Sequence, residues 1–407
     1  MVKNYLMLIF MLVLVLITTG CGGGGVTPPF EDEWTVMVYL DADNNLESAG
    51  IDDINEMEWV GSTTDVNIVV QVDRIPYSVL ASNNEGYADD ISNGNWTNTR
   101  RYYITQDYDP YIINSQLISN LGELNMGTPS TLINFANWAV TNYPAKRYLL
   151  VIWNHGGGFR STGLAKDIAW DDTSGGDKIT MYELEYALSA INTKMGKNID
   201  IVGMDACLMA MTEVAYQIKD CADILVTSEE NVPNDGWPYD TILAQLVATP
   251  TMSSTQLADT IVNRYIYSYT ASDNVTQSAI NLSYMDTLAS QLSNMALAIM
   301  SDTLTPTINY INAATYSQYY GDWDFIDLYD FCNKIYAYSY NIQVKNIAVS
   351  IKQTLTNSVG WGYNGYQVNK SRGLSIYFPY DPYDSYYNNT NFAQDTFWDE
   401  MLLSLGL

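Results

Sequence analysis

Short apolar runs typical of β-strands alternate along this chain with segments of helical periodicity. The runs are rich in β-branched and aromatic residues and cover residues 34–40, 66–72, 148–152, 199–204 and 224–227. Between them, apolar residues recur three or four positions apart, as at Leu184, Leu188 and Ile191. This alternation predicts an α/β fold, with a mostly parallel central sheet and helices on both of its faces.

The 407 residues are enough for one large domain or two ordinary ones. We expect the α/β core to cover residues 34–252. A largely helical, tyrosine-rich region should cover residues 253–407, with a strand at 373–379 that rejoins the sheet.

The first twenty residues are predicted to be a secretory signal rather than part of the fold. Lys3 precedes twelve consecutive apolar residues, Leu6 to Ile17, which is too short for a membrane-spanning helix and suits the apolar core of a signal peptide. Thr18-Thr19-Gly20-Cys21 is similar to a bacterial lipoprotein processing site, although such sites usually carry Leu where this chain has Thr18.

We therefore expect lipidation of Cys21 and a flexible tether over residues 21–33, which places the protein at a bacterial cell envelope or surface. Ordinary secretion with cleavage nearby is the alternative.

The charge balance argues against nucleic-acid binding. Forty-six acidic residues outnumber eighteen basic ones, for a formal net charge of −28. Such a field repels nucleic acid and favours basic peptides or divalent cations as partners.

The chemistry is expected to centre on His155, the only histidine of the chain, and on Cys207. Each follows a predicted strand, and parallel α/β sheets place their chemistry at the carboxyl ends of strands. A cysteine needs its thiolate form to be nucleophilic, and a helix over residues 208–215 would stabilise that form at its positive end. His155 would transfer protons, while the Gly156 and Cys207 amides would hold the oxyanion. The alternative is that Cys207 is an inert buried side chain.

Once Cys21 is assigned to lipidation, Cys207, Cys221 and Cys332 remain, so an exported chain keeps at least one thiol free. A second histidine and a Cys-x-x-Cys motif are both absent from the sequence, which excludes an ordinary structural zinc site.

Several motifs resemble the clostripain family of cysteine peptidases. They run in order from the first predicted strand to the last: residues 39–47, 154–158, 169–172, 204–210, 228–230, 236–239 and 373–379. The resemblance implies a caspase-like fold and a dyad of His155 and Cys207. It also implies cleavage after arginine or lysine, with acidic residues in the S1 pocket.

Asp205 suits that S1 pocket on independent grounds. It precedes Cys207 by two residues, so in an extended strand both side chains point the same way. A structural role as the cap of the following helix is the alternative. Glu230 and Asp235, on the loop after the next strand, are further S1 candidates, or else part of a solvated acidic loop.

Some members of the family mature by cutting themselves between histidine and cysteine, and some need calcium. Arg160, Lys166 and Lys178 are the candidate cleavage points, the two lysines being favoured. No cofactor is needed for the chemistry itself. Asp41, Asp43, Asp171 and Asp172 are candidate calcium ligands, although Asp43 could equally cap a helix.

The leading hypothesis is a lipid-anchored, extracytoplasmic cysteine endopeptidase that acts on peptides with basic P1 residues. One alternative is a catalytically inactive adhesin or binding lipoprotein on the same scaffold. A serine hydrolase ranks last, because the chain contains no Gly-x-Ser-x-Gly motif.

Overall fold

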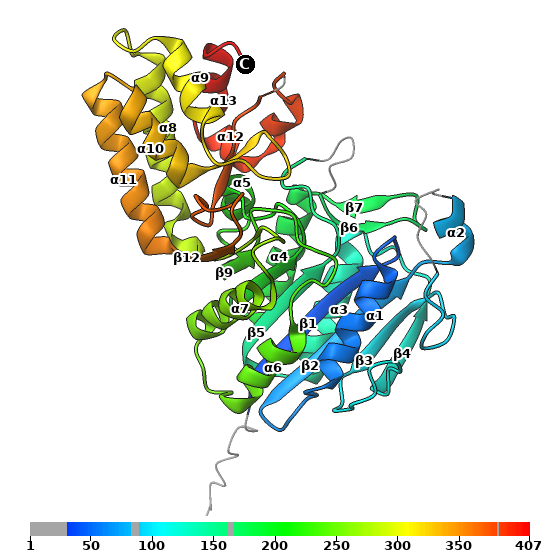
Figure 1. The fold of residues 1–407 in the computed structure, drawn as a ribbon. Coiled ribbons are helices and arrows are strands. Elements are labelled where there is room, and N and C mark those ends of the chain that lie inside the picture. Colours follow the sequence, from blue (N-terminus) through cyan, green and yellow to red (C-terminus); the bar gives the residue numbers. More distant parts are fainter. Residues whose placement is uncertain (1–30, 83–88, 161–166, 381) are drawn as a thin grey trace, which may run out of the picture. The chain divides into compact units, whose positions relative to one another are not determined.

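A nine-stranded sheet organises the residues that the computed structural model describes, which are 31–82, 89–160, 167–380 and 382–407 (Figure 1). Its strand order is β12-β10-β9-β8-β5-β1-β2-β3-β4. The strands of this sheet are β1 (Asp32–Ala42), β2 (Val66–Arg74), β3 (Thr99–Tyr103), β4 (Gln116–Gly122), β5 (Ala145–Trp153), β8 (Ile199–Asp205), β9 (Ala222–Thr227), β10 (Val275–Asn281) and β12 (Val359–Asn364).

The centre of this sheet is parallel and its edges are antiparallel. Strands β9, β8, β5, β1 and β2 pair in parallel, whereas β3 and β4 at one edge and β10 and β12 at the other pair antiparallel. The predicted α/β class and parallel core are confirmed, and the complete sheet is mixed. Two short hairpins lie outside it: β6 (Ile168–Asp171) with β7 (Asp177–Ile179), and β11 (Phe325–Asp327) with β13 (Ser375–Tyr377).

Both faces of the sheet are buried, because successive side chains of a strand point to opposite faces. In β1, Val36, Val38 and Leu40 belong to one hydrophobic cluster, whereas Met37 and Tyr39 belong to the other. Helices α1 (Glu47–Glu58), α6 (Tyr239–Ala248) and α7 (Ser254–Ser268) cover the first face, and α3 (Pro129–Asn142) and α4 (Met181–Met195) cover the second. The two short helices α2 (Tyr77–Ser82) and α5 (Thr212–Gln217) complete this half of the chain.

The C-terminal region is largely helical, as expected. Helices α8, α10 and α11 pack side by side (Figure 1). The helices of this region are α8 (Met285–Met300), α9 (Thr307–Thr315), α10 (Leu328–Tyr338), α11 (Ile342–Ser358), α12 (Asn391–Asp395) and α13 (Trp398–Ser404), together with two 3₁₀ turns at Leu282–Tyr284 and Ser385–Asn389.

The strand at residues 373–379 does not rejoin the main sheet, and that prediction is wrong. Its ordered part, β13, pairs antiparallel with β11. The edge of β9 that faces the C-terminal region is already occupied by β10, which in turn pairs with β12. The C-terminal region therefore contributes two strands, β10 and β12, to the main sheet. These strands were not predicted, because the sequence pattern of this region is mostly helical.

Residues 32–407 form a single compact unit. This agrees with the shared sheet, because β10 and β12 belong to the region after residue 252. None of the helices in the described ranges combines the length and the apolar composition that crossing a membrane requires.

The register of the central strands determines where polar residues gather. Leu40 of β1 lies opposite Trp153 of β5, and Trp153 lies opposite Asp205 of β8. Because all three strands are parallel, the segments that follow them emerge at the same edge of the sheet.

The buried centre of the sheet should tolerate truncation far less than its edge. Leu150 in β5 is 0% exposed, whereas Leu117 in edge strand β4 is 47% exposed. Replacing Leu150 by alanine should lower the free energy of unfolding by about 2–5 kcal/mol, and Leu117→Ala by about 0.5 kcal/mol or less. Urea denaturation of both variants measures this, and equal losses would contradict the described burial.

Candidate active site

His155 and Cys207 line one cavity at the carboxyl edge of the parallel strands. Each lies two residues beyond the paired positions Trp153 and Asp205. The cavity has a volume of about 220 Å³. Its lining comes from four segments of the chain: Leu46, Trp153–His155, Asp205–Cys207, and Val232, Pro233, Asn234 and Gly236. The structure thus brings the two predicted catalytic residues and Asp205 together.

The loops that carry the two catalytic candidates are in direct contact. A Cβ atom on Gly156 would lie 2.3 Å from the carbonyl oxygen of Cys207 and 3.0 Å from the Cβ of Ala206. Only glycine permits so close a backbone approach. This contact places the backbone of Gly156 beside that of Cys207.

Asn45 holds the imidazole of His155. The Nε2 atom of His155 lies 2.6 Å from the Oδ1 atom of Asn45. An amide oxygen only accepts, so Nε2 carries the hydrogen, and in the neutral ring Nδ1 is then the basic nitrogen. Sequence reasoning missed this residue, although it belongs to the motif at 39–47, because its role depends on β1 being the neighbour of β5.

The preceding residue, Asn154, anchors the histidine loop. Its Nδ2 donates to the carbonyl oxygens of Asp41 at 2.9 Å and Trp170 at 3.0 Å. Asn44 donates to the same two carbonyl groups, each at 3.1 Å. The ends of β1, β5 and β6 are therefore tied together by two asparagine amides.

Cys207 carries a protonated thiol in this arrangement. Burial raises its pKa to about 11, and the charges of Asp205 and Glu230 add to the effect. Its Sγ accepts a hydrogen bond from the Val232 amide at 3.3 Å, which lowers the pKa but does not offset the burial.

The predicted helix directly after Cys207 is wrong, because α5 begins only at Thr212. Residues 208–211 use their backbone to bind other segments instead: Leu208 donates to Glu230 at 3.3 Å and Ala210 donates to Ser228 at 2.8 Å. Leu208 adopts a left-handed conformation with φ of 62°. The positive end of a helix therefore does not stabilise a thiolate here.

Asp205 lies buried beneath the cavity, with 3% of its surface exposed. Its Oδ2 accepts from the Trp237 amide at 3.0 Å and from the Tyr239 hydroxyl at 3.2 Å. Its Oδ1 is buried without a hydrogen-bond partner. Asp205 does not cap α5, whose N-cap position is Met211.

A second carboxylate, Asp53 of α1, lies beside Asp205. Burial and the neighbouring Asp205 raise the pKa of Asp53 well above its usual range. Burial also raises the pKa of Asp205, to about 7. A buried carboxylate pair of this kind gains strongly from a cation placed against it.

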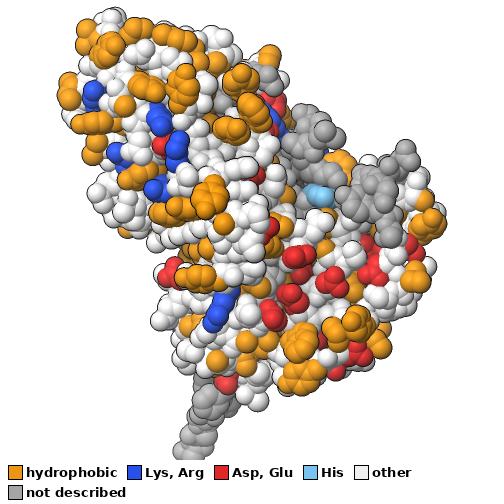
Figure 2. Space-filling view, viewed as in Figure 1, with side chains coloured by type: hydrophobic (Ala, Val, Ile, Leu, Met, Phe, Trp, Pro, Cys, Tyr) orange, Lys and Arg blue, Asp and Glu red, His pale blue; other side chains and the backbone are white. Residues whose placement is uncertain are grey.

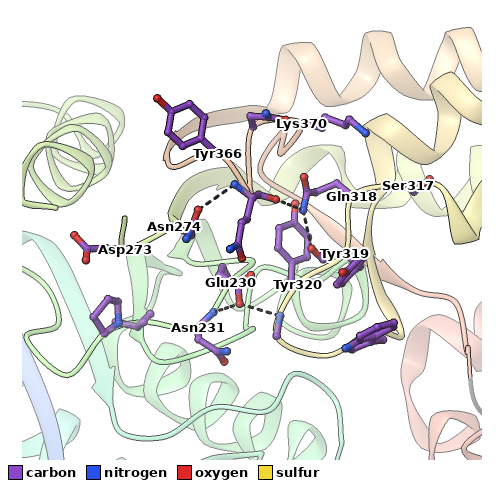
Figure 3. Close-up of a pocket in the computed structure, with 16 residues that line it drawn as sticks. Glu230, Asn231, Asp273, Asn274, Ser317, Gln318, Tyr319, Tyr320, Tyr366 and Lys370 are labelled. Atoms are coloured by element: carbon purple, nitrogen blue, oxygen red, sulfur yellow. Dashed lines mark hydrogen bonds between the residues drawn. The ribbon is translucent and has the colours of Figure 1, made fainter. Parts of the chain in front are cut away.

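The other two S1 candidates lie elsewhere. Asp235 is exposed and is not among the residues that line the cavity. Glu230 lines a wider neighbouring cavity of about 840 Å³, where its Oε1 accepts from the amides of Asn231 and Gly321, each at 2.8 Å (Figure 3). The two cavities share Val232 and Pro233, so they are neighbours along one segment.

Acidic side chains surround the site. Figure 2 shows Asp and Glu gathered on the face that also displays the single histidine. Burial raises the pKa values of Asp52 and Glu56 of α1; the charge of Asp240 adds to the shift of Glu56, and the charge of Asp235 adds to both shifts. The rim thus adds negative potential around the buried pair.

The three candidate cleavage points differ in their surroundings. Arg160 forms ion pairs with Asp322, Asp324 and Asp384. Lys178 lies in strand β7, with its ammonium group 5.1 Å from the ring centre of Trp170. Lys166, like the lipidation candidate Cys21, lies outside the described residues.

Two of the four predicted calcium ligands lie close together, in a group with two carboxylates that were not predicted. Asp43 and Asp171 offer oxygen atoms that lie within 4.8 Å of each other and of oxygens of Asp73 and Glu123. Asp41 and Asp172 are outside this group, and Oδ1 of Asp172 accepts from the Trp170 indole. Asp43 does not cap α1, because its Oδ1 accepts from Thr173 instead.

Cys221 and Cys332 are buried, and neither forms a disulfide with another described residue. Cys207, by contrast, is partly exposed to the cavity. Among the described residues, it is therefore the thiol best placed to meet a substrate.

Comparison with known proteins identifies the family of this chain. The model of the clostripain family matches residues 38–404. Clostripain of Hathewaya histolytica is 27% identical over 416 residues, which cover 88% of this chain and 77% of that protein.

Two solved structures share the fold. One is a secreted C11 cysteine protease from Bacteroides thetaiotaomicron in complex with an irreversible peptide inhibitor, with 21% identity, 90% of this chain and 99% of that chain covered, and a TM-score of 0.65. The other is an inactive zymogen C11 protease from Parabacteroides distasonis, with 19% identity, the same coverage and the same TM-score.

The family match runs from β1 to α13 and includes every segment that lines the cavity. The chain belongs to the clostripain family and is a cysteine endopeptidase.

Proposed function

We propose that this protein is an exported peptidase that uses a His155–Cys207 dyad to cleave peptide bonds after arginine or lysine. One observation carries the proposal: His155, Cys207 and the buried carboxylate of Asp205 line the same cavity. A single bound substrate residue would then be within reach of all three groups: the nucleophile, the group that carries the proton and the carboxylate that receives a cation.

The chemical step follows from the two protonation states. As the substrate binds, the Cys207 thiol gives its proton to the basic Nδ1 of His155, and the sulfur attacks the scissile carbonyl carbon. The Gly156 and Cys207 amides hold the resulting oxyanion. His155 passes the proton to the leaving amine, the carbon–nitrogen bond breaks, and water then hydrolyses the thioester.

The P1 residue is selected by the buried acid pair. Oδ1 of Asp205 lacks a partner, and Asp53 adds a second carboxylate at the same place. A guanidinium or ammonium group would supply the missing hydrogen bonds and neutralise the charge. An apolar P1 residue would leave Oδ1 of Asp205 without a hydrogen bond and would not neutralise the carboxyl pair.

Residues before P1 would run across Val232 and Pro233 into the wider cavity. That cavity presents amide groups of Asn231, Asn274 and Gln318 beside the rings of Tyr319 and Tyr366 (Figure 3). Such a surface suits an extended peptide with mixed polar and apolar side chains. An inactive adhesin is not favoured, because both members of the dyad are present at one cavity.

Selectivity for basic P1 residues should depend on Asp205 and on pH. The measurement is kcat/KM for matched peptides with P1 arginine and P1 citrulline, which is its uncharged counterpart. The arginine-to-citrulline ratio should be about 10²–10³ at pH 8. It should decline as the pH falls through about 7, because Asp205 becomes protonated with a pKa of about 7.

Asp205→Asn should abolish both the selectivity and its pH dependence. Asp235→Asn and Glu230→Gln serve as matched controls and should retain the ratio, because neither residue lines the small cavity. Cys207→Ala should cleave neither peptide. A ratio that follows Asp235 or Glu230 instead would refute the S1 assignment.

We also propose self-cleavage after Lys166. Arg160 would have to leave three carboxylates, and Lys178 would have to leave its strand, before either could enter the S1 pocket. The dyad would then cut the chain between its own histidine and cysteine segments.

The purified wild-type chain should therefore appear as two fragments, the second of which begins at Asp167. Cys207→Ala and Lys166→Met should each remain a single chain, and Lys178→Met should be cut normally. Mass spectrometry of the intact products decides between these outcomes. Two fragments from Cys207→Ala would rule out self-cleavage.

Export and anchoring complete the proposal. The apolar run 6–17 followed by Cys21 supports lipid attachment at that cysteine, and the related Bacteroides protease is a secreted protein. The N-terminal peptide of membrane-extracted protein should begin with a diacylglyceryl-modified Cys21. Cys21→Ser should release the protein from the membrane fraction, and an unmodified N-terminus elsewhere would exclude the anchor.

A further inference from the structure

Basic residues are concentrated in one stretch of the C-terminal region. Residues 331–380 contain five basic residues and no acidic one, whereas the rest of the chain contains thirteen basic and forty-six acidic residues. The five basic residues are Lys334, Lys345, Lys352, Lys370 and Arg372. Figure 2 shows Lys and Arg gathered over the helical region, away from the Asp and Glu that lie around the histidine. A strongly acidic chain therefore carries one positively charged surface.

Three of these cations alternate with three aromatic rings in a continuous row, which we name the basic ladder. The row crosses α10, α11, the loop before β13, and β12. Along it, each Lys Nζ or Arg Cζ atom lies 4.6–6.0 Å from the centre of the neighbouring ring. In order, the basic ladder consists of Lys345, Tyr336, Lys352, Tyr329, Arg372 and Trp361.

The ladder cations are held by rings rather than by carboxylates. Of the five basic residues, only Lys334 forms an ion pair with an acid among the described residues, which is Asp330 at 3.9 Å. Asp330 and Asp327, the two acids that precede this stretch most closely, are both buried. A cation over an aromatic face is fixed in position but keeps its charge. The ladder is therefore a preorganised row of positive charges without acidic neighbours at the surface.

Neutral hydrogen-bonding groups flank this row. The side chain of Tyr336 is 48% exposed and that of Trp361 is 38% exposed, so the ladder reaches the surface. Amide side chains both donate and accept, which suits the hydroxyl groups of sugars, whereas Lys and Arg suit carboxylate and sulfate groups. The exposed amide side chains of α10 and α11 are Asn333, Gln343, Asn346, Gln353 and Asn357.

A nucleic acid or a lipid bilayer matches this surface less well. Bases of single strands stack on open aromatic faces, but Tyr329 and Tyr336 each have two cations over their rings. Binding to a bilayer needs a wide apolar face beside the cations. Between Lys345 and Lys352, however, α11 exposes only one large apolar side chain, Val349.

The net charge of the chain does not prevent an anion from binding here. Charges are screened over about 8 Å at physiological ionic strength. The local charge of the ladder, rather than the formal net charge of −28, therefore determines the attraction at this surface.

We propose that the basic ladder binds an acidic polysaccharide, a polymer of hydroxylated sugars that carries carboxylate or sulfate groups. The ladder residues line neither the dyad cavity nor the wider cavity beside it. Binding at the ladder would hold the peptidase on material that bears such a polymer, while the active site stays open. The proposal does not depend on the catalytic dyad.

Binding is tested on the full chain with Cys207→Ala, so that proteolysis cannot interfere. Polygalacturonate and dextran sulfate are the acidic probes, and neutral dextran is the uncharged comparison. Calorimetric titration should show binding of both acidic polymers and none of dextran. The affinity should fall at least about tenfold when added NaCl shortens the screening length from about 10 Å to about 3 Å.

Lys352→Gln with Arg372→Gln, added to this parent, should weaken binding of both acidic polymers at least about tenfold, because two charge-assisted contacts are lost. Lys194→Gln with Arg264→Gln is the matched control. It removes the same two charges from exposed positions on α4 and α7 and should bind normally. Lys345→Gln alone, a milder change, should weaken binding at least about threefold. Circular dichroism verifies that each variant is folded.

The contribution of the ladder to binding of any probe is the difference between the parent and the Lys352→Gln, Arg372→Gln variant, so binding through the N-terminal segment cancels. Four results would each overturn the proposal. They are absence of binding to both acidic polymers, equal binding of neutral dextran, unchanged affinity in folded ladder variants, and a larger ladder contribution for single-stranded DNA or anionic phospholipid vesicles than for either polymer.

Discussion

The parallel register of β1, β5 and β8 is the constraint on which the rest of the structure depends. It sets Leu40, Trp153 and Asp205 side by side, so the segments that follow these strands must meet at one edge of the sheet. Asn45, His155 and Cys207 come from those three segments. A shift of one residue in the pairing of β1 with β5, or of β5 with β8, would turn the side chains of the shifted strand to the opposite face of the sheet. The three residues would then no longer lie together.

Burial of acidic groups is the second organising feature. Asp205 and Asp53 are buried at the dyad cavity, and Asp43, Asp73 and Asp171 are buried at the ends of β1, β2 and β6. Burying carboxylates is unfavourable unless a cation or a proton compensates for them. Under the proposed function, the substrate side chain would supply that charge in the first group. The proposed S1 pocket would thus give part of the large net negative charge of the chain a local use besides solubility.

Much of this arrangement could be predicted from local sequence. The five central strands, the main helices on both faces, and the positions of His155, Cys207 and Asp205 at strand ends follow from periodicity and from motifs. Non-local pairing could not be predicted. Residues 208–211 have good helix propensity, yet their amides bind Ser228 and Glu230. Likewise, β13 pairs with β11, because β10 and β12 already occupy the positions beyond β9 in the main sheet.

The group of candidate metal ligands also depends on non-local strand pairing and could be predicted only in part. Asp43 and Asp171 belong to recognisable motifs, but Asp73 and Glu123 join them only because β2 lies next to β1 and β4 follows β3 at the edge. Asn45 could not be predicted for a related reason. Its role becomes visible only when β1 and β5 are known to be neighbours.

The central claim is that one imidazole activates one thiol. The most direct measurement is labelling with an arginyl peptide that carries an electrophilic ketone, followed by mapping of the modified residue. We expect one label per chain, on Cys207, and a rate at least about 10²-fold slower in His155→Ala. Labelling of Cys221 or Cys332, or an unchanged rate without the imidazole, would contradict it.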